Sequence, residues 1–309
     1  MRADTRMKRA GQRWAWSPGR RSLTTRSFLP EGLHVIAYRA TLDVPRELAQ
    51  FVAMLLLAER HRRGTPRGSR ALTCFREAVL GLRWFRDRTG PDALARDHGI
   101  SRATAYRYVD EVTEVLAAQA PDLREALERA AGEGFSHVIL DGKIIPADRC
   151  KEKIISVKGE VIDLWYSGKA HAHGGNIQAV TAPDGFPLWV SPVEPGSVHD
   201  ITAARTHALP ALYRAAATGL PALADPGYDG AGIGIHIPVK QPAGGRDLDL
   251  NTRTRNAIQR SLRCLGERGF ALLNQRWRTL QHITASPGKI GDIARAALVL
   301  THFEHGYIT

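Results

Sequence analysis

The chain has 309 residues, of which 43% are hydrophobic and 24% are charged, and its formal net charge at pH 7 is +12. A chain of this size and composition can bury a core of its own, and its excess of cations favours polyanionic partners, with nucleic acid the leading candidate. The three cysteines form no CxxC pair and the longest apolar run is too short to span a bilayer, so we expect no disulfide scaffold, no thiolate zinc site and no membrane partner.

The first 34 residues are rich in arginine and lack apolar periodicity. This composition predicts a basic flexible arm over residues 1–34, which either contacts DNA without sequence preference or is an unstructured leader. The segment holds no apolar stretch followed by a cleavage site, so it is not expected to be a signal peptide. We therefore predict a cytoplasmic, nucleoid-associated protein.

Residues 35–125 are predicted to form an all-helical domain. Apolar residues recur at helical spacing in PRELAQFVAMLLLAERHRR (45–63), and the pattern returns in TCFREAVLGLRWFRDRTG (73–90) before Pro91. Two helical segments separated by turn residues are thus expected before residue 91.

The next segment has the layout of a helix-turn-helix motif. A short helix that contains the small residue Ala95 is predicted to end at Gly99, and Ser101 is placed to cap a second helix. In such motifs the early residues of the second helix meet base edges. The predicted DNA contacts are Arg102, Thr104, Tyr106 and Arg107. The alternative is a plain helical hairpin whose arginines are a solvated face.

Residues 134–309 are predicted to form an α/β domain with a mixed sheet flanked by helices. Short apolar runs between turn residues indicate strands in FSHVIL (135–140), NIQAVTAP (176–183), DGFPLWVSPV (184–193), LPALADPGYDG (220–230) and IHIPVK (235–240). A helix over residues 200–219 is expected before the fourth run, and a long helix is expected after the fifth.

Two aspartates stand where strands of this sheet are expected to end. Asp141 follows the apolar run of VILDG, and Asp225 follows that of PALAD. If these strands pair in parallel, both carboxylates lie at the carboxyl edge of the sheet, where open α/β sheets bind ligands. Magnesium prefers such oxygens, and a pair of metal ions is suited to phosphodiester chemistry.

A third carboxylate, Glu267, is the single acid of the cationic segment RSLRCLGERGFALLNQRWRTL (260–280). At about 100° per residue, Glu267 falls on the same side of one long helix as Arg260 and Arg263, opposite an apolar side. The apolar side comprises Ile258, Leu262, Leu265 and Leu272. The stripe is expected either to combine a metal ligand with phosphate contacts or to be an ordinary solvated face.

Five blocks together carry a family resemblance. They are VILDG (138–142), DLWYSGKAHAHGGNIQAV (163–180), GSVHD (196–200), LADPGYDGAGI (223–233) and RSLRCLGERGFALL (260–273). In their order and spacing, over roughly residues 70–305, the chain resembles DDE-superfamily transposases of bacterial insertion sequences. These proteins have an N-terminal helix-turn-helix and a ribonuclease H-like catalytic domain, and the resemblance implies the same fold here.

The resemblance also implies roles for individual residues. Asp141, Asp225 and Glu267 match the catalytic triad that binds two Mg²⁺ or Mn²⁺ ions. Arg263 matches the arginine of the family's Tyr-x2-Arg-x3-Glu-x6-Lys signature, and Lys169 of the YSGK block is the matching DNA contact.

The chain departs from that signature at two positions. Arg260 stands in place of the tyrosine and is taken as a further DNA contact, and Asn274 stands in place of the lysine. The charge that Asn274 lacks would have to come from Arg276 or Arg278.

Two other features have simpler interpretations. Asp200, in VHD, is a rival second acid, but a carboxylate at a helix N-terminus is commonly a cap. The glycines of GAGIG (230–234) resemble a dinucleotide-binding loop, yet they precede a strand and are expected to form a turn.

The sequence therefore predicts a DNA transposase that binds terminal inverted repeats and target DNA as a homodimer. It would cut and join phosphodiesters by two-metal chemistry. The first alternative is a decayed or domesticated transposase that binds a DNA sequence without cutting it. The others are a nuclease relative that acts on structured RNA, and a basic α/β protein with another role.

Overall fold

A computed structural model describes residues 41–156, 159–242, 244 and 247–308. The predicted arm over residues 1–34 lies outside these ranges. In the part of the chain that is described, no helix combines the length and the apolarity needed to cross a membrane.

The N-terminal helices are α1 (Arg46–Arg62), α2 (Cys74–Asp87), α3 (Pro91–His98), α4 (Arg102–Ala117) and α5 (Leu123–Gly132). The strands are β1 (Val138–Pro146), β2 (Lys153–Ile155), β3 (Val161–Asp163), β4 (Tyr166–Ser167), β5 (Ala172–Thr181), β6 (Pro187–Val190), β7 (Glu194–Pro195), β8 (Ala222–Leu223) and β9 (Ile235–His236). The later helices are α6 (Asp200–His207), α7 (Leu209–Ala217), α8 (Leu250–Arg263), α9 (Gly266–Arg276) and α10 (Ile290–Glu304), and the 3-10 turns are η1 (Pro226–Tyr228), η2 (Arg278–Gln281) and η3 (Pro287–Lys289).

Local capping fixes the ends of α3 and α4. Gly99 follows α3 with a φ of 64°, a left-handed conformation that glycine adopts without steric cost. The Ser101 hydroxyl accepts a hydrogen bond from the Thr104 backbone N–H at 3.2 Å and caps α4, as the sequence predicts. The two helices and their connection therefore lie where the sequence places them.

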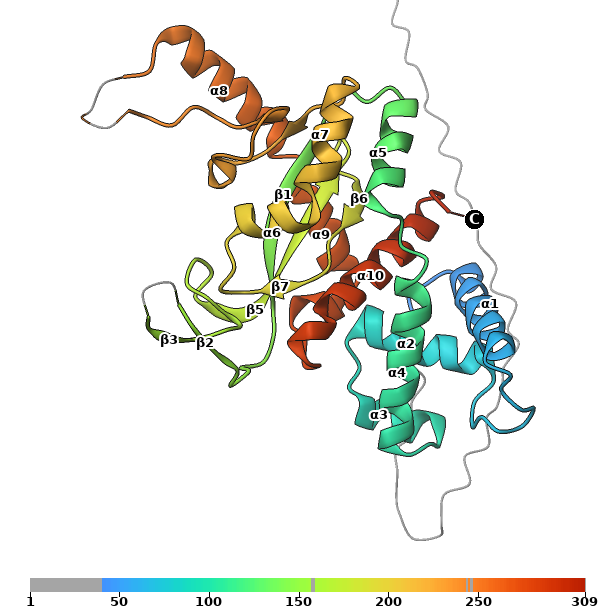
Figure 1. Cartoon of the computed structure of the whole chain (residues 1–309). Helices are drawn as coiled ribbons and strands as arrows, with labels where there is room; N and C mark the ends of the chain where they lie inside the picture. Colours follow the sequence, from blue (N-terminus) through green and yellow to red (C-terminus); the bar gives the residue numbers. More distant parts are fainter. Residues whose placement is uncertain (1–40, 157–158, 243, 245–246, 309) are drawn as a thin grey trace, which may run out of the picture. The chain divides into compact units, whose positions relative to one another are not determined.

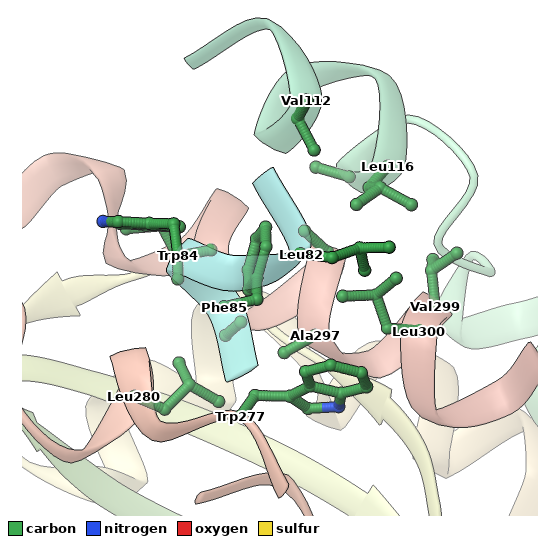
Figure 2. Packing of buried hydrophobic residues seen from close by; sticks show 14 of the residues in the cluster. Leu82, Trp84, Phe85, Val112, Leu116, Trp277, Leu280, Ala297, Val299 and Leu300 are labelled. Atoms are coloured by element: carbon green, nitrogen blue, oxygen red, sulfur yellow. The ribbon is translucent and has the colours of Figure 1, made fainter. Parts of the chain in front are cut away.

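The N-terminal helices share a hydrophobic core with the C-terminal end of the chain (Figure 2). Phe85 of α2 and Leu116 of α4 pack in one buried cluster with Leu300 of α10. Trp277 is fully buried in the same cluster, and its indole N–H donates to the Thr301 hydroxyl at 2.9 Å. Because these elements bury one another, α1–α4 are attached to α10 by apolar packing.

One mixed sheet organises the rest of the described chain. Its order is β4-β5-β1-β8-β9, and β6 and β7 also pair with β5. The strands β1, β5, β6 and β7 of this sheet are labelled in Figure 1. β1 runs antiparallel to β5 over eight residue pairs and parallel to β8. The mixed sheet with flanking helices confirms the predicted α/β class.

The two faces of the sheet are covered by different helices. Leu140 of β1 and Val180 of β5 pack with α5, α6 and α7. Ile145 of β1 and Ile177 of β5 pack with α9 and α10. Since neighbouring strand residues point to opposite faces, Asp141 lies on the α9 side and Gly142 on the α6 side.

Two predicted element boundaries are wrong. β1 does not end at Asp141, because Gly142 and Lys143 continue the ladder with Gln178 and Ile177 of β5, up to Pro146. The helix predicted over residues 200–219 is divided into α6 and α7 at Ala208, two residues before a proline that cannot donate a backbone hydrogen bond.

The predicted long helix is also interrupted. α8 ends at Arg263 and α9 begins at Gly266. Backbone hydrogen bonds between residues three apart cross the junction, such as the one from the Arg268 N–H to the Leu265 carbonyl at 3.0 Å. The apolar side of α8, which contains Ile258, is not its packed side. Ile258 is 57% exposed, whereas Asn256 on the opposite, polar side is buried. The Asn256 amide exchanges two hydrogen bonds of 2.9 Å with the Val239 backbone, so the polar side of α8 is its packed side.

Candidate active site at one edge of the sheet

Asp141 and Asp225 come together on neighbouring parallel strands. β1 and β8 pair in parallel, with Val138 beside Ala222 and Ile139 beside Leu223, so the condition set by the sequence analysis is met. Asp141 and Asp225 each follow two residues after the last of these pairs, and they are close enough for the charge of Asp225 to raise the pKa of Asp141. Asp225 there accepts a hydrogen bond from the Gly227 backbone N–H at 2.8 Å, which turns the chain sharply into η1.

The pKa of Asp141 shows the electrostatic character of this edge. This pKa is raised from 3.8 to about 6; burial is the largest cause, and the charges of Asp225 and Asp200 contribute to the rise. Arg263 and a backbone hydrogen bond from Gly142 act in the opposite direction. Clustered carboxylates in a partly desolvated place favour a proton or a cation as a partner.

Glu267 faces the same hollow as Asp141 but does not join the aspartates. A pocket of about 440 Å³ is lined by Asp141, Gly142, Lys143, Glu267, Arg268, Phe270 and Ala271. Among the residues that the structure describes, no three His, Cys, Asp or Glu side chains lie close enough together to hold one ion. Glu267 thus stands across a pocket from Asp141, and the triad stays a prediction.

A chain of polar side chains lies on the opposite face of β1. The Tyr228 hydroxyl donates to Gln178 Oε1 at 2.6 Å, and Gln178 Nε2 donates to Asn176 Oδ1 at 2.9 Å. Asn176 Nδ2 donates to Asp200 Oδ1 at 2.8 Å, and Lys169 Nζ donates to Asp200 Oδ2 at 2.8 Å. We call these five residues the polar network; it joins the loop after β4 to the turn after Asp225.

Asp200 is not the cap that the sequence suggests. It is the first residue of α6, whose N-cap is His199, and no capping bond from a side chain is formed there. Its two oxygens instead accept from Asn176 and Lys169.

The predicted contacts of α4 lie near the start of that helix. Arg102, Tyr106 and Arg107 are exposed, whereas Thr104 is only half-exposed. Arg107 donates to the Thr104 hydroxyl at 3.0 Å, and Arg102 pairs with Asp92 at 3.0 Å. The three longer side chains are therefore the accessible part of the predicted set.

The predicted contacts of the α/β domain differ in accessibility. Lys169 is 73% exposed although it is paired with Asp200, and Arg260 is exposed on α8. Arg263 is half-buried, and its charge lowers the pKa of Asp141. Arg263 thus acts on the acidic residues themselves.

The two arginines considered as substitutes for the family's lysine are not equivalent. Arg276 is bound to Asp43 and Glu304 by four hydrogen bonds of 2.5–2.9 Å. Arg278 is exposed. Asn274 itself is half-buried, and its Oδ1 has no hydrogen-bond partner.

Four residues at or near the site were not predicted from the sequence: Asn176, Gln178, Tyr228 and Lys143. Asn176 and Gln178 alternate with apolar residues in NIQAV, so a strand there places two amides on one face. That alternation was the available signal for the polar network. Lys143 lines the pocket beside Glu267, and its Nζ lies 5.7 Å from the centroid of the Phe270 ring.

A comparison with known protein families identifies the family of the chain. A family model described as DDE superfamily endonuclease matches residues 140–302, just over half of the chain. The matched segment contains Asp141, Asp225 and Glu267 and leaves α1–α5 outside. No curated protein matches the chain.

Proposed function

The chain belongs to the DDE superfamily of endonucleases, and from this premise we propose that it is a metal-dependent DNA transposase. It would bind the terminal inverted repeats of its element, cut at their ends and join them to target DNA, acting as a homodimer on DNA. Its α/β part would be a ribonuclease H-like catalytic domain, and α3 and α4 would form a helix-turn-helix.

One observation carries the proposal. The parallel register of β1 and β8 sets Asp141 beside Asp225, although the two are far apart in sequence, and the family match spans both. The raised pKa of Asp141 supports it, since burial and two nearby carboxylates disfavour the charged form of Asp141, and a divalent cation would stabilise that form.

The donor set fits magnesium in part. Mg²⁺ is commonly held by one or two carboxylates, with water and substrate phosphates completing its shell. Asp141 and Asp225 would supply the carboxylates. Glu267, across the pocket from Asp141, would join them when DNA occupies the pocket. When bound, the metal would stabilise charge on the attacking and leaving oxygens of the phosphodiester.

The remaining residues would orient the DNA. Arg263 would balance the negative charge around Asp141, and Lys143 and Arg268 would contact phosphates at the pocket. Arg102 and Arg107 of α4 are exposed and would contact a duplex. The net charge of +12 supports the same partner.

The test is cleavage of a duplex that carries the DNA flanking the coding region, with Mg²⁺. We expect wild-type protein to leave 3′-hydroxyl ends, and D141N and D225N to lose at least about 100-fold in rate. The matched control is D229N, because Asp229 is an exposed carboxylate that pairs with Lys240 beside the same turn. Cleavage by D141N at the wild-type rate would refute the assignment of Asp141.

A second candidate is a protein that binds the same DNA without cutting it. It is favoured by Asn274, where the family's signature has a lysine, and by the ion pairs that occupy Arg276. Tight, specific binding of the flanking DNA by a wild-type protein that does not cut it with Mg²⁺ or Mn²⁺ would establish this candidate instead.

A further inference from the structure

Asp200 lies near the candidate active site without belonging to its pocket. Its side chain is 13% exposed, and both of its oxygens are occupied by hydrogen bonds of 2.8 Å. The charge of Asp200 affects the pKa of Asp141, yet its carboxylate lies on the α6 side of the sheet and that of Asp141 on the α9 side. Asp200 is thus close to the acidic residues but directed elsewhere.

The support behind Asp200 is rigid. Asn176 and Gln178 are at most 1% exposed, and the Asn176 amide is also held by the Val198 carbonyl at 2.9 Å. A chain of buried, mutually satisfied polar groups fixes the orientation of each member. Asp200 is therefore presented to the surface in one position.

The network also packs against the backbone that carries Asp141. A Cβ atom at Gly142 would lie 2.6 Å from Gln178 Nε2, 2.8 Å from Asp200 Oδ1 and 2.9 Å from the Tyr228 hydroxyl. Such distances leave no room for a side chain, so glycine is required at this position. Any shift of the polar network would therefore displace Gly142, the residue that follows Asp141.

The outer end of the network is a single cation. Lys169 lies in the loop between β4 and β5 and is 73% exposed, so its ammonium can meet a ligand while Asp200 holds it. The pKa of Lys169 is raised first by its bond to Asp200 and then by the charges of Asp225 and Asp141. The ammonium thus lies within the field of both candidate catalytic carboxylates.

We propose that Asp200 is a positioning residue, which holds the Lys169 ammonium near the Gly142 backbone that follows Asp141, so that the ammonium meets a DNA phosphate in a fixed place. The inference rests on the proposed function, since it concerns the phosphate that this site would cut. A free lysine side chain has many rotamers, and fixing it beforehand removes that ordering cost when DNA binds. Asp200 is then neither a metal ligand nor a helix cap.

A double-mutant cycle tests the inference on the flanking-DNA duplex with Mg²⁺. D200N keeps an oxygen for the Asn176 bond and loses the charge that holds Lys169; Asp200→Ser replaces it if D200N does not fold. We expect D200N and Lys169→Met each to slow single-turnover cleavage about 10-fold, and D200N to add less than about 2-fold when Lys169 is already Met. The Mg²⁺ concentration for half-maximal rate should stay within about 2-fold.

Two results of the cycle would overturn the proposal. If the two effects multiply, Asp200 acts independently of Lys169. If D200N raises the Mg²⁺ requirement about 10-fold or more, Asp200 is a metal ligand.

A second readout needs no activity. Only the neutral form of an amine attacks an activated ester and displaces its alcohol, so loss of the Asp200 charge should speed acylation of Lys169 about 3-fold or more in DNA-free protein, as measured by mass spectrometry. Lys240 is the internal control, because it forms a 2.8 Å pair with Asp229 outside the network. An unchanged Lys169 rate in D200N refutes the pairing. A wild-type protein that does not cut the duplex refutes the proposed function, and the acylation rates still decide whether Asp200 holds Lys169.

Discussion

Replacement of Asp141 by asparagine should stabilise the metal-free protein, and the gain should depend on pH. Folding raises the pKa of this carboxyl from 3.8 to about 6. At about 1.4 kcal/mol per pH unit, ionised Asp141 is therefore about 3 kcal/mol less stable in the folded than in the unfolded chain. The stability that the wild-type protein keeps when Asp141 is protonated is fully present below pH 3.8, and it is lost as the pH rises through about 6.

The measurement is the free energy of unfolding in urea, from pH 4 to 7.5 with a chelator present. The difference between D141N and wild type should grow by about 2.5 kcal/mol over this range, because a small part of the full change lies below pH 4. A constant offset from altered hydrogen bonds does not affect this slope. D229N is the matched control. Lys240 lowers the pKa of Asp229 in the folded protein, so the difference in unfolding free energy between D229N and wild type should change with pH in the opposite direction.

Magnesium should reverse the order of stability. Above pH 6, Mg²⁺ should raise the free energy of unfolding of wild type by relieving the carboxylate repulsion, and it should do much less for D141N. A difference between D141N and wild type that is flat or shrinks with rising pH would show that Asp141 is not the strained carboxyl described here.

Three further substitutions test other parts of the structure. Gly142→Ala should cost about 2 kcal/mol of unfolding free energy, because its Cβ would overlap the polar network, and unchanged stability would contradict that packing. Arg276→Ala should lower the free energy of unfolding by about 2 kcal/mol, because it leaves Asp43 and Glu304 without their partner, and should leave DNA affinity unchanged. Arg278→Ala should weaken DNA binding without loss of stability. The reverse pattern would make Arg276 the DNA contact. Arg107→Ala should reduce the slope of log affinity against log salt by about 1 in fluorescence anisotropy with duplex DNA, and Arg124→Ala on α5, the control, should not; equal slopes would remove α4 from the interface.

Signals carried by single residues or short patterns were accurate. The cap at Ser101 and the left-handed Gly99 fix the ends of helices by local chemistry that the sequence contains. Two apolar runs that are each followed by an aspartate indicated the strands before Asp141 and Asp225, and these strands pair in parallel. Such signals were usable because each depends on few neighbours.

The misassignments came from tertiary partners that no local pattern contains. The helical wheel separated an apolar side with Ile258 from a polar side, but it could not show which side packs: Asn256 bonds to the Val239 backbone and Ile258 remains exposed. β1 was predicted to end at Asp141 because the apolar run ends there, whereas its ladder with β5 extends to Pro146. The partner of Lys169 was equally hidden, since Asp200 is distant in sequence and resembles a cap.

The most direct test of a shared metal site is anomalous diffraction from crystals of the protein–DNA complex grown with Mn²⁺. We expect an anomalous peak within ligand distance of carboxylate oxygens of both Asp141 and Asp225, and we expect this peak to be lost in D225N. A peak bound by neither aspartate, or one that survives unchanged in D225N, would contradict it.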